Sequence, residues 1–423
     1  MVERCPDKTE VEGSIPSTRT KIMKILLIGT GAVGSVLSRY LSRDNEVSEI
    51  ICASKDTKRA KEFIDANNKK IKLISLDASN IEEIVSKARG VNLIINASLP
   101  RFNENILEAA LRVGAHYQDL ASNLGGGSTK LNDLKDVEQL KFHEKFRKAK
   151  LVGLINTGVA PGITNLFARE AADKLNEVDD IRFRCIEEQK ASEFIFAWSA
   201  ETTLEGLTAP PLVYRNGRFT LTKPFENSEE YEFPEPFGKR HAFSIYGDEV
   251  ATIPLFIKVK NVDFKSSGAD IEFSKALSRL GFFNKKPIIV KGKKIIPLEF
   301  FKKIAPKVPS PKKMVQLIKS GIVENAGFAL VVEVIGKKQN RSAKIKMSAT
   351  FPDLKEIYKT FPGATYISYP TGTAAYSFSK IIPQMKSGGV FPPEALDDKM
   401  RKNVMLTLKS NGIIISQQFQ KNR

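Results

Sequence analysis

A run of three glycines constrains the fold of this 423-residue chain more than any other feature. Gly29, Gly31 and Gly34 directly follow MKILLI, a continuous apolar segment of the kind that forms a buried strand in a parallel sheet. From Val33 to Leu41, apolar residues then recur at helical spacing. A strand, a tight glycine turn and a helix predict a dinucleotide-binding unit, in which the helix N-terminus holds the pyrophosphate. The expected cofactor residues of this turn are Gly29, Thr30, Gly31, Ala32, Val33 and Gly34.

The same alternation of apolar strands and helical segments continues along the N-terminal half of the chain. Buried strands are expected at 25–28, 49–53, 71–76, 91–96 and 151–156. Helical segments separate them, including a long polar helix expected over 131–150. Alternating strands and helices predict an α/β fold with a doubly wound parallel sheet of the Rossmann type. After about residue 176 the segments alternate polar and apolar residues, and Asn216-Gly217 marks a hairpin, which predicts an α+β domain with a mixed or antiparallel sheet.

Composition excludes several classes of protein. Apolar residues make up 42% and charged residues 27% of the chain, and no apolar run approaches the ~18 residues of a membrane span, so a membrane protein and a disordered chain are excluded. The three cysteines, Cys5, Cys52 and Cys185, are too scattered for a disulfide framework or a zinc site. We therefore expect a cytoplasmic protein without a metal site.

The net charge of +18, from 66 basic and 48 acidic residues, raises the question of a nucleic-acid partner. The densest lysine stretch, 285–313, is interleaved with proline and β-branched residues and has no recognition-helix or finger pattern. A solvated basic face accounts for this pattern, so we expect neither a nucleic-acid nor a membrane partner.

The end of the second strand discriminates between the two nicotinamide cofactors. NAD enzymes usually place an acidic residue there for the ribose hydroxyls, whereas a 2′-phosphate needs neutral or cationic partners. Ser54 occupies that position with Lys55 beside it, which favours NADP, although Asp56 stays within reach of a ribose and leaves NAD as the alternative. Asp77, at the end of the third strand, is expected near the adenine. Residues Asn96, Ala97 and Ser98, after the fourth strand, are expected near the nicotinamide ribose.

Several further blocks in a fixed order resemble the saccharopine dehydrogenase-like family. They are LIGTGAVGS at 27–35, ISLDAS at 74–79, LIINASLP at 93–100, AHYQDLAS at 115–122, GVAPGITNLFA at 158–168, TGTAAY at 371–376 and GGVFPPE at 388–394. The resemblance covers most of the chain, and saccharopine reductases, lysine 6-dehydrogenases and carboxynorspermidine dehydrogenases share it. It implies hydride transfer between NADP and the carbon of an imine or amine, on an amino-acid or polyamine substrate.

The resemblance also implies where the chemistry occurs. It places Asp119 in the substrate pocket, where a carboxylate would orient the amine and handle its proton, with His116 as a second candidate. Expected substrate contacts are Tyr117, Gly158, Pro161 and Gly162, since a Pro-Gly turn before a helix exposes N–H groups that suit a substrate carboxylate. An Asp in this context is also a common turn or cap residue. Weaker candidates in the second domain are Glu187, Trp198, Ser199, Glu201, Thr202, Arg240 and His241, each with an ordinary structural explanation.

The family architecture and the change of pattern together suggest four segments. We expect a disordered tail at 1–22, a nucleotide-binding domain at 23–158, a substrate-binding and dimerisation domain at 159–365, and a segment at 366–423 that returns to the first domain. The resemblance implies a homodimer.

Two other functions stay open at this point. One is a different Rossmann dehydrogenase of the homoserine or semialdehyde type, against which the absence of a well-placed Cys-His pair argues, because Cys185 lies in a strand pattern. The other is a non-catalytic dinucleotide- or nucleic-acid-binding protein, because a fold by itself does not fix a function.

Overall fold

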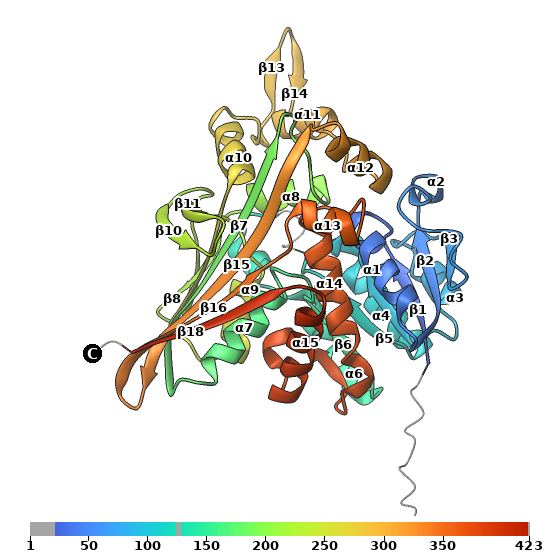
Figure 1. Ribbon diagram of the computed structural model, residues 1–423, viewed down its shortest axis with the longest axis horizontal. Coiled ribbons are helices and arrows are strands. Elements are labelled where there is room, and N and C mark those ends of the chain that lie inside the picture. Colours follow the sequence, from blue (N-terminus) through green and yellow to red (C-terminus); the bar gives the residue numbers. More distant parts are fainter. Residues whose placement is uncertain (1–21, 124–127, 422–423) are drawn as a thin grey trace, which may run out of the picture.

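The computed structural model describes residues 22–123 and 128–421, and contains two large sheets joined side by side (Figure 1). The tail predicted at 1–22, apart from Ile22, and the glycines at 125–127 lie outside the described residues. The first sheet has seven parallel strands in the order β17-β6-β5-β4-β1-β2-β3. The strand order reverses between β1 and β4, and such a switch point is where open parallel sheets bind ligands.

The strands of the first sheet are short and buried. They are β1 (Met23–Ile28), β2 (Val47–Ser54), β3 (Ile71–Ser75), β4 (Leu93–Asn96), β5 (His116–Asp119), β6 (Val152–Leu154) and β17 (Gly389–Phe391). Helices α1 (Ala32–Arg43), α2 (Thr57–Ala60), α3 (Ile81–Lys87), α4 (Asn103–Val113) and α6 (His143–Lys148) connect or cover them. Helix α1 is amphipathic, and its buried Val36, Leu37 and Leu41 lie on the face turned to the protein interior. The predicted Rossmann-type sheet is thus confirmed.

The predicted helix over 131–150 is wrong as a single element. The chain instead forms α5 (Leu131–Leu134), a 3₁₀ turn (Glu138–Phe142) and then α6. Glu138 and Gln139 turn inward at the break, where Glu138 Oε1 accepts hydrogen bonds from Asn103 Nδ2 (2.8 Å) and the backbone N–H of Asn123 (3.0 Å). These buried polar contacts fix a local geometry that a continuous helix does not provide, so they override the helical pattern.

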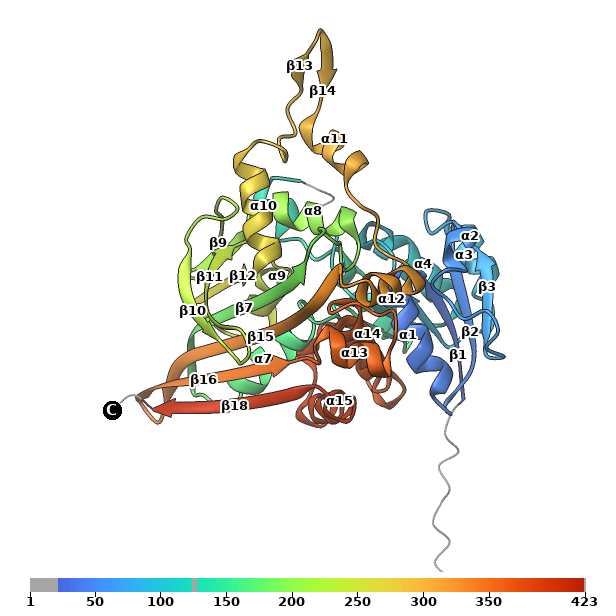
Figure 2. The same ribbon diagram turned by 45° about the horizontal axis from the view of Figure 1, so that its top comes forward.

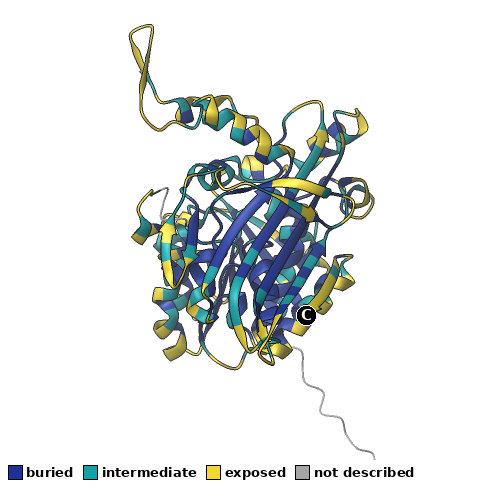
Figure 3. Ribbon diagram, turned by 90° about the vertical axis from the view of Figure 1, so that its left-hand side faces the viewer, coloured by how far each residue is buried: buried dark blue, intermediate teal, exposed yellow. Residues whose placement is uncertain are grey.

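The second sheet is mixed and contains nine strands among the described residues. Its main path is β10 (Glu229–Phe233), β11 (Gly238–Ser244), β12 (Asn261–Ser267), β7 (Glu177–Ala191), β15 (Val323–Lys338), β16 (Arg341–Thr350) and β18 (Ile414–Lys421), with β8 (Leu212–Arg215) and β9 (Arg218–Leu221) beside β12. Strands β7 and β12 are parallel, and the other pairs are antiparallel. The middles of its long strands are buried (Figure 3). The mixed sheet and the Asn216-Gly217 hairpin are as predicted, and both residues have positive φ.

Helices cover the second sheet and close the space beside it (Figure 2). They are α7 (Ile163–Ala172), α8 (Ala200–Thr208), α9 (Glu249–Phe256), α10 (Ala269–Arg279), α11 (Pro297–Ile304), α12 (Pro311–Lys319) and α13 (Leu354–Thr360). A small hairpin, β13 (Ile288–Val290) with β14 (Lys293–Ile295), stands off the body and is exposed (Figures 1 and 3). None of the helices described is long and apolar enough to cross a bilayer.

The last part of the chain contacts both sheets. Strand β17 extends the first sheet next to β6, whereas β18 lies at the edge of the second. Helix α14 (Ser368–Ser379) packs on α1 so closely that a Cβ on Gly372 would lie 2.6 Å from Val36 Cγ1. Helix α15 (Asp398–Ser410) packs against α14. The C-terminal segment therefore fixes how the first sheet sits against the second.

Candidate functional site

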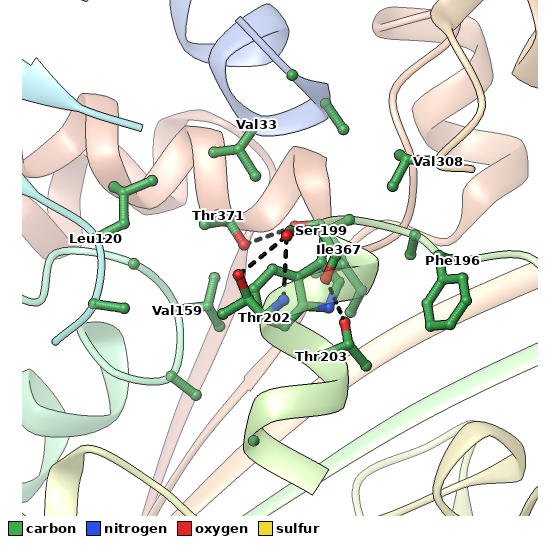
Figure 4. Close-up of a pocket in the computed structure, with 18 of the residues that line it drawn as sticks. Val33, Leu120, Val159, Phe196, Ser199, Thr202, Thr203, Val308, Ile367 and Thr371 are labelled. Carbon is green, nitrogen blue, oxygen red and sulfur yellow. Dashed lines mark hydrogen bonds between the residues drawn. The ribbon is translucent and has the colours of Figure 1, made fainter. Parts of the chain in front are cut away.

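A cavity of about 500 Å³ lies between the carboxyl ends of the first sheet and the inner side of the second. The loops after β1, β4 and β5 form one wall, and β7, β12, α8 and the start of α14 form the other. Figure 4 shows Val33, Leu120 and Val159 around the same space as Ser199, Thr202 and Phe196. Both halves of the chain are therefore needed to build the cavity.

The glycine turn has the geometry that a bound pyrophosphate requires. Gly29 has φ +101°, and a Cβ there would lie 2.4 Å from the carbonyl carbon of Ala97. A Cβ on Gly34 would lie 2.1 Å from the carbonyl oxygen of Gly29, so these two glycines are needed for packing. Gly31 faces open space, and no side chain caps α1. The N-terminal N–H groups of α1 thus remain available to an anion, and Thr30, Gly31, Ala32 and Val33 line the cavity.

The tip of β2 differs in part from the sequence interpretation. Ser54 lines the cavity, but Lys55 points away and forms an ion pair with Asp77, Nζ to Oδ2 2.7 Å. The hydrogen bond from Lys55 lowers the pKa of Asp77, and neither residue lines the cavity. Asp56 caps α2 by accepting a hydrogen bond from the N–H of Arg59 (2.9 Å). Arg59 lines the cavity and is the cation that the sequence reasoning missed, although it lies only one turn beyond Ser54.

The turn after β4 lies at the switch point of the sheet. Asn96 Oδ1 accepts hydrogen bonds from the N–H (2.9 Å) and the hydroxyl (2.6 Å) of Ser98, and Asn96 Nδ2 donates to Asn103 Oδ1 (2.8 Å). Asn96, Ala97 and Ser98 all line the cavity, next to the glycine turn. The structure therefore brings these three predicted residues together with Thr30 to Val33.

Asp119, the predicted catalytic carboxylate, lies behind the cavity wall. It is 1% exposed and does not line the cavity, whereas the next three residues, 120–122, do. Its Oδ1 accepts a hydrogen bond from the N–H of Asn156 (2.7 Å), and its Oδ2 accepts from the hydroxyl of Tyr117 (2.9 Å) and from Gln139 Nε2 (3.2 Å). Burial raises the pKa of Asp119 to about 7. This geometry suits a residue that positions the loop after β5.

The other two polar residues of that block also lie away from the cavity. Tyr117 is fully buried, with its hydroxyl 3.1 Å from Asn103 Oδ1 as well as near Asp119. His116 begins β5, at the end of the strand remote from the switch point, and its Nδ1 accepts a hydrogen bond from the N–H of Val152 (3.0 Å). Neither His116 nor Tyr117 lines the cavity.

Some residues of the Pro-Gly turn before α7 line the cavity, and another fixes the shape of the turn. Gly158 and Pro161 line the cavity. Gly162 does not; it has φ +135°, and a Cβ there would lie 1.9 Å from the carbonyl oxygen of Gly158. Its N–H donates to Asn165 Oδ1 (3.0 Å), so it shapes the turn rather than the cavity surface.

Two adjacent carboxyl groups at the start of α9 line the cavity and were missed by the sequence reasoning. Asp248 is 5% exposed; its Oδ2 accepts a hydrogen bond from the N–H of Ser122 (3.0 Å), and its Oδ1 has no partner among the described residues. Glu249 is fully buried, and its Oε1 accepts from the hydroxyl of Thr164 (2.7 Å). Burial raises the pKa of Asp248 well above its usual range and that of Glu249 to about 7. Such groups keep or release a proton near neutral pH.

The far part of the cavity, on β7 and α10, is also acidic. Glu187 and Asp270 line it, together with Trp198, Ser199 and Thr202, so four of the weaker sequence candidates do reach the cavity. Glu201 does not; it pairs with Arg101, Oε1 to Nη1 2.7 Å. Arg240 and His241 lie on β11 away from the cavity. A cavity with an anion-binding turn at one end and carboxyl groups at the other is suited to a dinucleotide and a cationic second ligand.

The comparison with known proteins agrees with this arrangement. The family model described as "Saccharopine dehydrogenase NADP binding domain" matches residues 25–154, and that described as "Saccharopine dehydrogenase C-terminal domain" matches residues 158–413. Together the two models span both sheets.

Individual proteins resemble this chain at low sequence identity. Carboxynorspermidine synthase of Vibrio alginolyticus is 26% identical over 303 residues, covering 67% of this chain and 73% of that protein. Carboxyaminopropylagmatine dehydrogenase of Synechocystis is 24% identical over 390 residues, covering 88% and 93%. Saccharopine dehydrogenase (L-Glu forming) of Saccharomyces cerevisiae has a similar structure, with a TM-score of 0.66, 15% identity and coverage of 94% and 100%.

Proposed function

Because this chain belongs to the saccharopine dehydrogenase-like family of NAD(P)-binding oxidoreductases, we propose that it transfers a hydride between NADP and the carbon of an imine or amine in an amino acid or polyamine. The supporting observation is that the glycine turn and the buried carboxyl groups of α9 line one cavity. The names of two relatives, a carboxynorspermidine synthase and a carboxyaminopropylagmatine dehydrogenase, point to substituted polyamines.

The tip of β2 supports NADP over NAD. The 2′-phosphate would meet the hydroxyl of Ser54 and the guanidinium of Arg59, which both line the cavity. Asp56 also lines the cavity, but its Oδ1 accepts the N–H of Arg59 as the cap of α2, which leaves one carboxylate oxygen for a free ribose. Lys55 contributes less than its position in the sequence suggests, because it pairs with Asp77.

The chain's own residues have distinct roles in this proposal. The cofactor, when bound, supplies or accepts the hydride, and the N-terminus of α1 holds its pyrophosphate. Asp248 holds the substrate ammonium and exchanges its proton, and Glu249 beside it, whose pKa burial raises to about 7, holds a second proton at that wall. Asp119, the first candidate from sequence, acts as a positioning residue through the loop after β5, and His116, the second, acts through its hydrogen bond to the N–H of Val152 on β6. The backbone of Gly158 and Pro161 closes the cavity next to the reacting carbon.

The proposal also assigns a function to each segment of the chain. We assign nucleotide binding to residues 23–158 and substrate binding and dimerisation to 159–365. Of the segment 366–423, α14 and β17 return to the nucleotide-binding unit, whereas β18 joins the second sheet. A cytoplasmic homodimer fits the family and the few scattered cysteines.

A spectrophotometric screen at the absorbance of the reduced nicotinamide tests this function. NADP and NAD are offered with lysine, saccharopine, ornithine and polyamines as oxidisable substrates, and NADPH and NADH with pairs of a carbonyl compound and an amine. We expect turnover with a secondary amine or its carbonyl and amine precursors, and faster turnover with NADP(H). Turnover only with hydroxy acids or aldehydes would support another Rossmann dehydrogenase, and cofactor binding with no turnover at all would support a non-catalytic protein.

A further inference from the structure

An arm of the second unit, residues 281–305, stands off the body and exposes many apolar side chains. It consists of the hairpin of β13 and β14 followed by α11, and the tip of the hairpin projects beyond both sheets (Figures 2 and 3). Single exposed apolar residues are common on proteins, whereas a concentration of them marks an interaction surface. Of the thirteen large apolar side chains that are exposed among the described residues, six lie in this arm: Ile288, Ile289, Val290, Ile296, Phe300 and Ile304.

Helix α11 is apolar on two sides, of which only one is packed. On the inner side Leu298 is buried, and the ring of Phe301 packs edge-on against two phenylalanine rings of the preceding loop. On the outer side Ile296, Phe300 and Ile304 recur every fourth residue, and this spacing places them on one stripe of the helix. The outer stripe is therefore as apolar as the inner face but faces solvent.

The hairpin places apolar and cationic side chains next to each other. Its register pairs Ile289 with Lys294 and Val290 with Lys293, and directly opposite residues of an antiparallel pair share a face. Each face of the ribbon therefore carries a lysine beside an exposed apolar side chain. A two-stranded hairpin is at best marginally stable by itself, so a partner that covers this one would also stabilise it.

The arm is also strongly basic. It contains seven lysines and one acidic residue, Glu299, which pairs with Lys302, Oε1 to Nζ 3.1 Å. Lys291, Lys293 and Lys294, at the tip of the hairpin, form no ion pair with any residue that the structure describes. The positive charge of the tip is therefore uncompensated by the protein.

Three kinds of partner can cover a basic surface, and one of them matches both its charge and its apolar residues. A nucleic acid would neutralise the lysines but leave the side chains of β13 in water. A second copy of this chain has a net charge of +18, and contact between two arms would bring their lysines together. An anionic lipid surface offers phosphates to the lysines and an apolar boundary to the isoleucines, and lysine stems can lie along that boundary.

We propose that the arm docks on the surface of an anionic lipid bilayer. The side chains of β13 and the outer stripe of α11 enter the boundary between headgroups and acyl chains, and the lysines contact the lipid phosphates. This is attachment to one surface and needs no membrane span. It goes beyond the proposed function and revises the expectation of no membrane partner, which rested on the lysine pattern of 285–313 and not on the exposure of its apolar residues.

Co-sedimentation of the full chain with sucrose-loaded vesicles tests this docking without any substrate. Vesicles of equal parts phosphatidylglycerol and phosphatidylcholine should bind the protein at least about tenfold more strongly than vesicles of phosphatidylcholine alone, and added salt should weaken that binding. Lys293→Gln should weaken it by about fivefold, as expected for one lysine near an anionic surface. Ile289→Asp, which places a charge at the apolar boundary, should weaken it by at least about tenfold.

Helix α15 supplies a matched control for each change. Leu406→Asp matches Ile289→Asp, since the two side chains are 64% and 66% exposed, and Lys399→Gln matches Lys293→Gln at another exposed lysine. Both controls should bind anionic vesicles as the unaltered protein does. All four changes are at exposed positions, so each variant should keep its melting temperature.

Several outcomes would overturn the docking. They are no binding to either kind of vesicle, equal binding to both, or an equal loss of binding in the Leu406 variant. Sedimentation equilibrium tests the second copy directly: a dimer that Ile289→Asp dissociates, without vesicle binding, would assign the arm to a partner subunit. Because none of these measurements depends on turnover, failure of the docking and failure of the proposed function are distinguishable.

Discussion

The backbone N–H of Ser122 donates a hydrogen bond to Asp248 Oδ2 at 3.0 Å and so joins the loop after β5 to the start of α9, 126 positions further along the chain. The hydroxyl of Ser122 donates to Asn156 Oδ1 at 3.0 Å, which ties the same loop to the end of β6. One oxygen of Asp248 is thus fixed by the nucleotide-binding sheet, and the other has no partner among the described residues. This places a carboxylate from the second unit directly beside the switch point of the first.

Asp248→Asn should reduce turnover without weakening cofactor binding. Asn keeps the shape and an acceptor for the Ser122 N–H but carries no charge and takes up no proton. Loss of one positioned acid–base group typically lowers the rate by about 10²- to 10⁴-fold. Steady-state kinetics with the substrate found by the screen, together with NADPH titration, measure the two effects. Asp136→Asn, a change at an exposed residue paired with Lys141, is the control and should leave both unchanged. Normal turnover in the Asp248 variant would exclude the assigned role.

Asp119→Asn should act mainly on stability. Asp119 accepts hydrogen bonds from the N–H of Asn156 and the side chains of Tyr117 and Gln139, and an amide nitrogen in place of one oxygen faces a donor at one of these contacts. The unsatisfied buried group should cost roughly 1 to 3 kcal/mol of the free energy of unfolding. Urea unfolding measures this cost.

The kinetics of the same Asp119 variant distinguish positioning from catalysis. If Asp119 acts only through the loop after β5, Asp119→Asn should lower turnover less than Asp248→Asn does. Unchanged stability with a rate loss of about 10²-fold or more would instead support the direct acid–base role inferred from sequence.

The first sheet was predictable because its signals are local. Each strand of a buried parallel sheet is a short apolar run, and the φ of Gly29 and the close contact of Gly34 are properties of one turn. The break at Glu138 was not predictable, because its cause is a contact with Asn103, 35 positions away. A helical pattern cannot reveal a buried partner of that kind.

The candidate site was predictable mainly on the cofactor side, although the predicted Gly158 and Pro161 and the weaker candidates Glu187, Trp198, Ser199 and Thr202 also line the cavity. Thr30 and Ser98 follow strand ends, and strand ends of a parallel sheet meet at one edge. Asp248 is brought to that edge by the fold of a second unit, and its sequence neighbourhood carries no motif. Lys55 and Asp77 follow the ends of the neighbouring strands β2 and β3, so they form an ion pair with each other. This pair cannot be predicted when the end of each strand is considered separately.

Cofactor preference should depend on Ser54 and Arg59. Ser54→Asp introduces a charge that repels a 2′-phosphate, and Arg59→Ala removes the cation that would pair with it. We expect each change to lower NADPH affinity by roughly tenfold or more while NADH affinity changes little. Calorimetric titration of both cofactors checks this. Lys55→Ala is the control and should lower NADPH affinity less than either change, because Lys55 forms an ion pair with Asp77. Tighter NADH than NADPH binding by the unaltered protein would contradict the preference.

Glu249 should make the protein less stable as the pH rises through the weakly acidic range. The fully buried Glu249 has a pKa of about 7 in the folded chain against an ordinary value of 4.5, so the unfolded chain releases this proton first. Below about pH 4.5 both states hold the proton and the stabilisation is complete; between about pH 4.5 and 7 it is progressively lost, by at most about 3 kcal/mol.

Glu249→Gln removes this titration and keeps an acceptor for Thr164 Oγ1. The free energy of unfolding of the variant should therefore fall less steeply between about pH 4.5 and 7 than that of the unaltered protein, since Gln stays neutral throughout. Urea unfolding at a series of pH values measures the difference between the two curves, which cancels the contribution of the other buried carboxyl groups. Glu193→Gln, at an exposed position, should give a curve parallel to that of the unaltered protein. If the curve of the Glu249 variant is also parallel to that of the unaltered protein, Glu249 releases its proton at an ordinary pH in the folded chain. Glu249 would then hold no proton at the cavity wall near neutral pH.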